Sequence, residues 1–266
     1  MHDWIVALIL GIVEGITEFL PVSSTGHLLI AEKFLHSHQS DLFNVVIQCG
    51  AVIAVLPLFP ERMYKFFFEL RQKETQDYLL KLLVAFAITG AGGLVIDHLN
   101  FKLPEELPPV AWALLIGGIA FLAVEFHIQG KKLGEQVTWA VVVAVGCGQL
   151  IAAIFPGSSR SGTTILLSLL LGLSRPAATE FSFLVGIPTM MAAGGLKIFK
   201  SLHHPDPAAP PENWGLVILA TVVAAVVSFI AVKWLLRYVQ THTFNAFGWY
   251  RIALALGIFG LLMFAK

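Results

Sequence analysis

Charged residues are scarce in this chain of 266 residues. Asp, Glu, Lys and Arg make up 13% of the sequence, whereas 57% of it is hydrophobic. Soluble globular domains carry about 25% charged residues, so the composition excludes an ordinary soluble domain and indicates an α-helical membrane protein. The 17 basic and 17 acidic side chains cancel. Without a basic excess, nothing in the sequence suggests a nucleic-acid partner.

Cysteines and the common cofactor motifs are also few or missing. The two cysteines, Cys49 and Cys147, both lie in apolar segments, where free core thiols are expected rather than a disulfide or a metal pair. The sequence contains no Gly-x-x-x-x-Gly-Lys phosphate loop and no Cys/His zinc pattern. Nothing therefore implies ATP or a structural zinc ion.

Apolar segments, by contrast, recur from one end of the chain to the other. Six are long enough to cross a hydrocarbon layer of about 30 Å at about 1.5 Å per helical residue. They are expected near residues 42–59, 79–96, 109–127, 177–199, 214–236 and 247–264. Four further segments form two pairs, 4–20 with 26–35 and 138–155 with 162–173, and only a short loop separates the members of each pair. The sequence therefore predicts an all-α polytopic fold with six transmembrane helices and two re-entrant helical hairpins.

The two hairpins resemble each other in sequence. Residues 16–24 read Ile-Thr-Glu-Phe-Leu-Pro-Val-Ser-Ser, and residues 151–159 read Ile-Ala-Ala-Ile-Phe-Pro-Gly-Ser-Ser. This alignment matches Pro21 with Pro156, Ser24 with Ser159, and Glu14 with Gln149. Interrupted segments at corresponding positions of two halves indicate a binding site at the repeat interface. We expect one membrane domain over residues 1–266, with inverted-repeat halves of about 1–108 and 109–266.

The distribution of basic residues predicts the orientation. Lys and Arg gather in residues 62–73, 131–132, 175 and 233–237, which all fall on one side of the six-span scheme. The positive-inside rule makes that side cytoplasmic and puts both termini outside. The first hairpin then enters from the outside and the second from the cytoplasm.

Two glutamates, Glu14 and Glu18, lie one helical turn apart in the first apolar segment, so both carboxylates project from one helix face. A charge in hydrocarbon costs about 2.5–3.5 kcal/mol on insertion scales, and such residues generally face a polar cavity. We interpret the pair as ligands of a divalent cation, Mg²⁺ or Ca²⁺, that bridges to phosphate oxygens. The loop that follows offers Ser24 or a water molecule as nucleophile and His27 as proton carrier. The alternatives are that Ser23 and Ser24 only cap a helix and that His27 is a structural hydrogen-bonding residue.

The tip of the second hairpin predicts an anion site. Residues 155–164 read Phe-Pro-Gly-Ser-Ser-Arg-Ser-Gly-Thr-Thr, with one cation, Arg160, among hydroxyl groups. Its planar guanidinium suits phosphate oxygens, the glycines free backbone amides for a ligand, and a helix N-terminus favours an anion. The predicted phosphate contacts are Ser23, Thr25, Gly157, Ser159, Ser161 and Thr164. The alternative is that Arg160 anchors the chain at the membrane interface while the hydroxyl groups cap a helix.

At these residues the chain resembles a known family. Its motifs Glu14-x-x-x-Glu18-Phe-Leu-Pro-Val-Ser-Ser-Thr-Gly-His27 and Pro156-Gly-x-Ser-Arg-Ser-Gly-x-Thr164 are similar to the two signatures of the bacterial undecaprenyl-diphosphate phosphatases associated with bacitracin resistance. The resemblance covers essentially the whole chain. It implies hydrolysis of a C55 polyprenyl diphosphate to the monophosphate and inorganic phosphate, which recycles the lipid carrier for peptidoglycan synthesis. It also implies a homodimer in the bacterial inner membrane, a divalent cation and a site open to the periplasm.

The resemblance assigns functional roles to the matching positions Glu14, Glu18, Ser24, His27, Ser159, Arg160 and Thr164. Of these, the catalytic set is predicted to be Glu18, Ser24, His27 and Arg160. The alternative function is a secondary transporter or lipid flippase for a phosphorylated substrate, because inverted repeats with broken helices are common in transporters. A transporter needs only the phosphate cradle, whereas a hydrolase also needs a nucleophile and an acid or base. The presence of candidates for all three favours the hydrolase.

Overall fold

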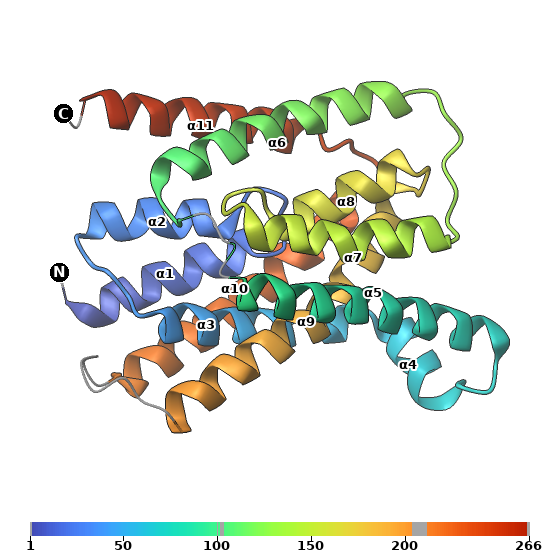
Figure 1. Ribbon diagram of the computed structural model, residues 1–266, viewed down its shortest axis with the longest axis horizontal. Helices are drawn as coiled ribbons and strands as arrows, with labels where there is room; N and C mark the ends of the chain where they lie inside the picture. The colour runs from blue at the N-terminus through green and yellow to red at the C-terminus, as the bar shows by residue number, and fades with distance from the viewer. Residues whose placement is uncertain (1, 100, 102–103, 204–211, 265–266) are drawn as a thin grey trace.

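The computed structural model describes residues 2–99, 101, 104–203 and 212–264, and its regular elements within these residues are helices (Figure 1). In chain order they are α1 (Asp3–Thr17), α2 (Ser24–Leu35), α3 (Asp41–Ile53), the 3-10 turn η1 (Leu56–Leu58), α4 (Pro60–Phe68), α5 (Lys73–His98), α6 (Leu107–Ile128), α7 (Trp139–Ile154), α8 (Arg160–Leu170), α9 (Arg175–His203), α10 (Trp214–Tyr238) and α11 (Asn245–Phe264).

Six stretches of the described chain are long and apolar enough to cross a membrane: α3 with η1, α5, α6, α10 and α11, together with residues 175–201 of α9. They coincide with the six predicted spans. A helix satisfies its backbone hydrogen bonds within one segment, which is why it is stable in hydrocarbon. The predicted fold class, an all-α polytopic membrane protein, is confirmed. Both cysteines are free, as predicted, but only Cys49 is buried, and Cys147 is exposed on α7.

The remaining apolar helices form the two hairpins α1–α2 and α7–α8. The hairpins extend from opposite ends of the molecule, and their tips meet near its middle (Figure 1). With 12 and 11 residues, α2 and α8 are too short to cross about 30 Å of hydrocarbon. The start of α1 and the end of α11 lie at one end of the molecule and α4 lies at the other (Figure 1), as six spans require. That the hairpins re-enter the membrane stays a prediction.

The two tips share one unusual backbone conformation. Ser23 and Ser159 have φ values of 75° and 69°, a region that few non-glycine residues adopt. Each serine caps the next helix, because its hydroxyl oxygen accepts a hydrogen bond from the backbone N–H of Gly26 at 3.3 Å or Gly162 at 3.2 Å. The structural counterpart of Ser159 is therefore Ser23. The alignment that paired it with Ser24 is wrong by one residue at the tips.

The packing of the hairpins on the spanning helices also repeats. Helix α1 packs on α10 and α7 packs on α5, and a glycine permits each close approach. A Cβ atom on Gly11 would lie 2.6 Å from the carbonyl oxygen of Ala220, and one on Gly146 would lie 3.1 Å from that of Ala85. Gly146 follows Gly11 by as many residues as Ala220 follows Ala85, whereas Ser159 follows Ser23 by one residue more. The second hairpin therefore has one additional residue between Gly146 and its tip.

The division into inverted halves stays a prediction, but the repeated contacts bear on its boundary. They pair α1 with α7 and α5 with α10, so the corresponding halves meet between α6 and α7. A boundary near residue 108 would leave two candidate spans in the first half and four in the second. We therefore favour a boundary in the connection from α6 to α7.

Candidate functional site

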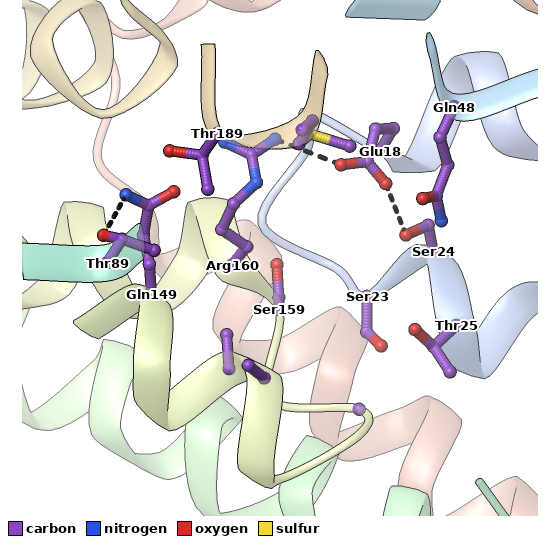
Figure 2. Close-up of a pocket in the computed structure, with 14 residues that line it drawn as sticks. Glu18, Ser23, Ser24, Thr25, Gln48, Thr89, Gln149, Ser159, Arg160 and Thr189 are labelled. Carbon is purple, nitrogen blue, oxygen red and sulfur yellow. Dashed lines mark hydrogen bonds and ion pairs between the residues drawn. The ribbon is translucent and has the colours of Figure 1, made fainter. Parts of the chain in front are cut away.

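A cavity of about 300 Å³ lies where the two hairpin tips meet. The tips, α3, α5, α7 and α9 all contribute to its wall (Figure 2). Its lining residues are Glu18, Ser23, Ser24, Thr25, Gln48, Thr89, Gln149, Ala152, Ala153, Gly157, Ser159, Arg160, Thr189 and Met190.

Glu18 links the two hairpins in this cavity. Its Oε1 accepts a hydrogen bond from Nη2 of Arg160 at 3.0 Å, and its Oε2 accepts one from the hydroxyl of Ser24 at 2.7 Å (Figure 2). Glu18 is only 7% exposed, so water screens this ion pair weakly. Three of the four predicted catalytic residues thus form one hydrogen-bonded chain.

Arg160 has hydrogen-bonding capacity to spare. Its Nε and Nη1 are buried and meet no acceptor among the described residues. An unsatisfied buried donor costs about 1–3 kcal/mol, and more when it is charged. A ligand with anionic oxygens would remove this cost, because the guanidinium presents its donors as a planar fork.

Gly186 of α9 makes room for this guanidinium. A Cβ atom at Gly186 would lie 1.7 Å from Nη1 of Arg160, so a larger residue would displace the arginine side chain. The ring of Phe19 lies on another side, with its centroid 5.4 Å from Cζ of Arg160. A weak sequence signal exists for Gly186. The segment Phe43-Asn-Val-Val-Ile-Gln resembles Phe181-Ser-Phe-Leu-Val-Gly, which matches Gly186 with Gln48.

Glu14 lies outside the cavity lining, one turn before Glu18. It is 0% exposed, and neither carboxylate oxygen has a hydrogen-bond partner among the described residues. Two orphaned carboxylate oxygens fit a hard divalent cation. The described residues contain no group of three or more His, Cys, Asp or Glu side chains that could hold a metal. A cation here would therefore depend on Glu14, Glu18, water and substrate oxygens, a ligand set typical of Mg²⁺.

His27 does not reach the cavity wall. Its Nδ1 lies 2.7 Å from the carbonyl oxygen of Ser23, and its Nε2 lies 2.7 Å from the hydroxyl of Tyr250. Because a carbonyl only accepts, Nδ1 donates, and in the neutral ring Nε2 then accepts from Tyr250. The structure thus places His27 between the first tip and α11, outside the cavity lining.

The predicted phosphate-binding residues separate into two groups. Ser23, Thr25, Gly157 and Ser159 line the cavity. The other two are buried elsewhere: Ser161 donates to the carbonyl of Leu20 at 3.2 Å, and Thr164 donates to that of Arg160 at 2.8 Å. Both residues lie in α8, after the cap residue Ser159, on a helix face that packs against protein. The motif in the sequence did not reveal this burial.

Several polar residues of the site lie outside both sequence motifs. Gln149 donates through Nε2 to the hydroxyl of Thr89 at 2.9 Å, and its buried Oε1 has no partner among the described residues. Gln48 and Thr189 also line the cavity. The repeat alignment had singled out Gln149 as the match of Glu14, whereas Thr89 and Thr189 lie in long apolar helices and belong to neither motif. Only the folded chain brings these residues together.

The fold and the site define a class: a polytopic helical membrane protein whose two hairpin tips meet at a cavity lined by acidic, hydroxyl and guanidinium groups. A model of one protein family, described as bacitracin resistance protein BacA, matches residues 7–257. The chain therefore belongs to the BacA family.

Similar proteins match over nearly their full length. A protein named undecaprenyl-diphosphatase from Rhizobium etli (strain ATCC 51251) is 49% identical over 97% of each chain. Proteins of the same name from Xylella fastidiosa (strain 9a5c) and Xanthomonas oryzae pv. oryzae (strain PXO99A) are 50% and 49% identical. These matches cover 96% of this chain, and 97% and 95% of the respective relatives.

Proposed function

We propose that this chain is an undecaprenyl-diphosphatase, which hydrolyses undecaprenyl diphosphate to the monophosphate and inorganic phosphate. Relatives of that name are about half identical to it over nearly its whole length. The observation that carries the proposal is the chain of hydrogen bonds from Ser24 through Glu18 to Arg160, beside two unpartnered guanidinium donors. Regeneration of the monophosphate carrier connects the activity with cell-wall synthesis and bacitracin resistance.

Arg160 and the serine-rich tips bind the diphosphate in this proposal. The free Nε and Nη1 of Arg160 donate to phosphate oxygens, and Ser23, Thr25, Ser159 and the backbone at Gly157 complete the cradle. Positively charged and N–H donors stabilise the charge that moves onto the leaving phosphate oxygen. Ala152, Ala153 and Met190 form an apolar part of the wall, which suits the adjoining lipid portion of the substrate.

Two routes to hydrolysis are compatible with the hydrogen bond between Ser24 and Glu18. In the first, the Ser24 oxygen attacks the terminal phosphorus, its proton passes to Glu18, and the lipid monophosphate leaves. Water then cleaves the phosphoserine. In the second, water attacks directly while Ser24 donates a hydrogen bond to the phosphate. Rapid acid quench and mass spectrometry distinguish the two, since only the first route forms a phosphoserine at Ser24.

The divalent cation, Mg²⁺ or Ca²⁺, belongs to the proposal as well. Glu14 and Glu18 are the residues that would hold it. When bound, the ion supplies positive charge that offsets the charge of the diphosphate. His27 as proton carrier also stays a proposal. Its contacts with Ser23 and Tyr250 instead support a role in holding the first tip.

The protein is a multi-pass membrane protein, and we place it in the bacterial inner membrane with the cavity open to the periplasmic side. The basic helix α4 and the basic connection from α6 to α7 lie at the end opposite the start of α1 and the end of α11 (Figure 1), which supports a cytoplasmic position for that end. The opening of the cavity toward the periplasm follows from the family resemblance. We further propose a homodimer, which rests on the family resemblance alone.

Phosphate release by the purified protein in detergent tests the proposed function. Detergent micelles have no compartments, so a transporter or flippase gives no signal in this assay. We expect Mg²⁺- or Ca²⁺-dependent release of one phosphate per undecaprenyl diphosphate, and loss of release in Arg160→Ala. A folded protein that binds the lipid diphosphate without releasing phosphate would instead support the transporter alternative.

A further inference from the structure

Arg251 is a buried cation that the proposed reaction does not use. It lies in α11, one of the candidate membrane spans, and is 0% exposed. It is absent from the cavity wall, and no carboxylate of the described residues forms an ion pair with it. A charge at such a depth is costly and usually functional, so its surroundings need an explanation.

The Arg251 guanidinium donates to backbone carbonyls of both hairpin tips. Its Nη1 donates to the oxygen of Pro21 at 3.2 Å, in the turn between α1 and α2. Its Nη2 donates to Gly157 at 3.3 Å and Ser158 at 3.0 Å, in the turn between α7 and α8. Two carbonyls of α6 accept from the same side chain at 3.1 and 3.4 Å. One guanidinium thus connects both tips to α6 and α11.

Gly157 itself lines the cavity, and the other two tip carbonyls belong to residues close to the cavity in the chain. Pro21 lies two residues before the cap residue Ser23, and Ser158 immediately precedes Ser159 and Arg160. Movement of either tip relative to the other would break hydrogen bonds to a buried charge, which are stronger than hydrogen bonds between neutral groups. Arg251 therefore opposes changes in the separation of the tips.

The neighbouring helices leave space for this side chain in particular. A Cβ atom on Gly117 of α6 would lie 2.2 Å from Nη2 of Arg251, and one on Gly162 of α8 would lie 3.2 Å from Nη1. Any side chain at Gly117 would displace the guanidinium. A lysine at position 251 would have one ammonium group in place of the planar fork and could not hold the same set of acceptors.

We infer that Arg251 is a positioning residue that fixes the separation of the two hairpin tips and so aligns Ser24 and Glu18 with Arg160. The catalytic consequence rests on the proposed phosphatase function, whereas the structural consequence does not. A displacement of about 1 Å at a reacting centre can lower a rate about 100-fold, so an arginine outside the cavity can still control turnover.

Arg251→Lys tests the inference, with Arg175→Lys as its matched control. Arg175 also contacts a buried partner, since its Nε donates to Glu125 at 2.9 Å. Neither Arg175 nor Glu125 lines the cavity. We expect Arg251→Lys to lower kcat about 100-fold while KM changes less than about threefold, and Arg175→Lys to change kcat less than about threefold. Wild-type kcat in folded Arg251→Lys would overturn the inference.

Distances between spin labels test the positioning without reference to activity. The labels are attached to cysteines replacing Phe34 of α2 and Leu170 of α8, which are 65% and 49% exposed, in a Cys49→Ala, Cys147→Ala background. We expect a narrow distance distribution in this parent and in Arg175→Lys, and a shifted or broadened one in Arg251→Lys. An unchanged distribution in Arg251→Lys would overturn the inference. Absence of phosphate release by the parent would contradict the proposed function alone.

Gly117→Ala gives the same test if Arg251→Lys fails to fold. Its Cβ displaces the guanidinium and leaves the charge in place, and alanine favours a helix more than glycine does. Gly90→Ala in α5 is the matched control, because a Cβ at Gly90 would meet nothing within 4 Å. We expect the label distances to change in Gly117→Ala only. If the two variants gave the same distances and kcat as the parent, Arg251 would not set the tip separation.

Discussion

The two hairpins have the same backbone at their tips but opposite charges. Ser23 and Ser159 share a positive φ and the same cap hydrogen bond. At the next position the first hairpin has Ser24 and the second has Arg160. The first hairpin also carries the carboxylates. One scaffold, used twice, thus places a nucleophile candidate and a cation on opposite sides of a cavity (Figure 2).

The helices behind the tips differ in a complementary way. The segment around Gln48 of α3 resembles the segment around Gly186 of α9, and Gln48 lines the cavity whereas Gly186 gives space to Arg160. The long side chain of Arg160 on the second tip thus faces a glycine, whereas the short side chain of Ser24 on the first tip shares the cavity with the longer Gln48. The two halves of the site therefore carry different chemistry, and the size of the neighbouring residue differs with it.

Replacing Glu18 should have the largest effect, because Glu18 joins the two hairpins. Glu18→Gln removes the negative charge that accepts hydrogen bonds from Ser24 and Arg160. At about 2 kcal/mol for each charge-assisted bond, we expect turnover to fall about 1,000-fold. Phosphate release by purified protein measures this, with circular dichroism as the folding control. Near wild-type turnover would show that the carboxylate charge is not required.

Arg160→Lys should follow, with about a 100-fold loss of kcat/KM. The ammonium keeps the charge but lacks the planar fork that contacts Glu18 and phosphate oxygens together. Arg62→Lys is the matched control, since Arg62 pairs with Glu180 at 2.6 Å outside the cavity. Steady-state kinetics of both variants decide the matter. Equal rates in Arg160→Lys and wild type would reduce Arg160 to a local electrostatic anchor.

Gly186→Ala tests the complementary volumes without touching a polar group. Its Cβ would overlap Nη1 of Arg160, so the guanidinium must move, and we expect a loss of about 30-fold in kcat, close to 2 kcal/mol. Gly195→Ala in the same helix is the control, because a Cβ there meets nothing within 4 Å. Similar kinetics for the two variants would mean that Arg160 adapts without loss.

The sequence predicted the elements of the site better than the directions of its side chains. Apolar length alone predicted the six spans, and the repeated Pro-x-Ser-Ser element predicted that the two tips are related. His27, Ser161 and Thr164 belong to the same motifs, yet they do not line the cavity, and their side chains instead contact Tyr250 and the carbonyls of Leu20 and Arg160. Gly186 and Arg251 act through close approach to residues far away in the chain, which local sequence patterns signal only weakly. A charge within the last apolar segment was the one sequence signal for Arg251.

Glu14→Gln should have the smallest effect, and it tests whether turnover needs the negative charge of Glu14 in addition to that of Glu18. The corresponding residue of the second hairpin is Gln149, which is buried with an unpartnered carbonyl oxygen, as Glu14 is buried with two unpartnered carboxylate oxygens. A neutral amide thus fits this kind of position, so we expect the variant to fold.

If Glu14 helps to hold a cation, Glu14→Gln should lower turnover about 10-fold at a fixed Mg²⁺ concentration, equivalent to about 1.4 kcal/mol. Because a second carboxylate remains on Glu18, higher Mg²⁺ should restore part of the lost rate. Phosphate release measured over a range of Mg²⁺ concentrations separates the two roles of Glu14. A lower rate with an unchanged Mg²⁺ dependence would assign Glu14 to the packing of α1 and leave the cation to Glu18 and the substrate.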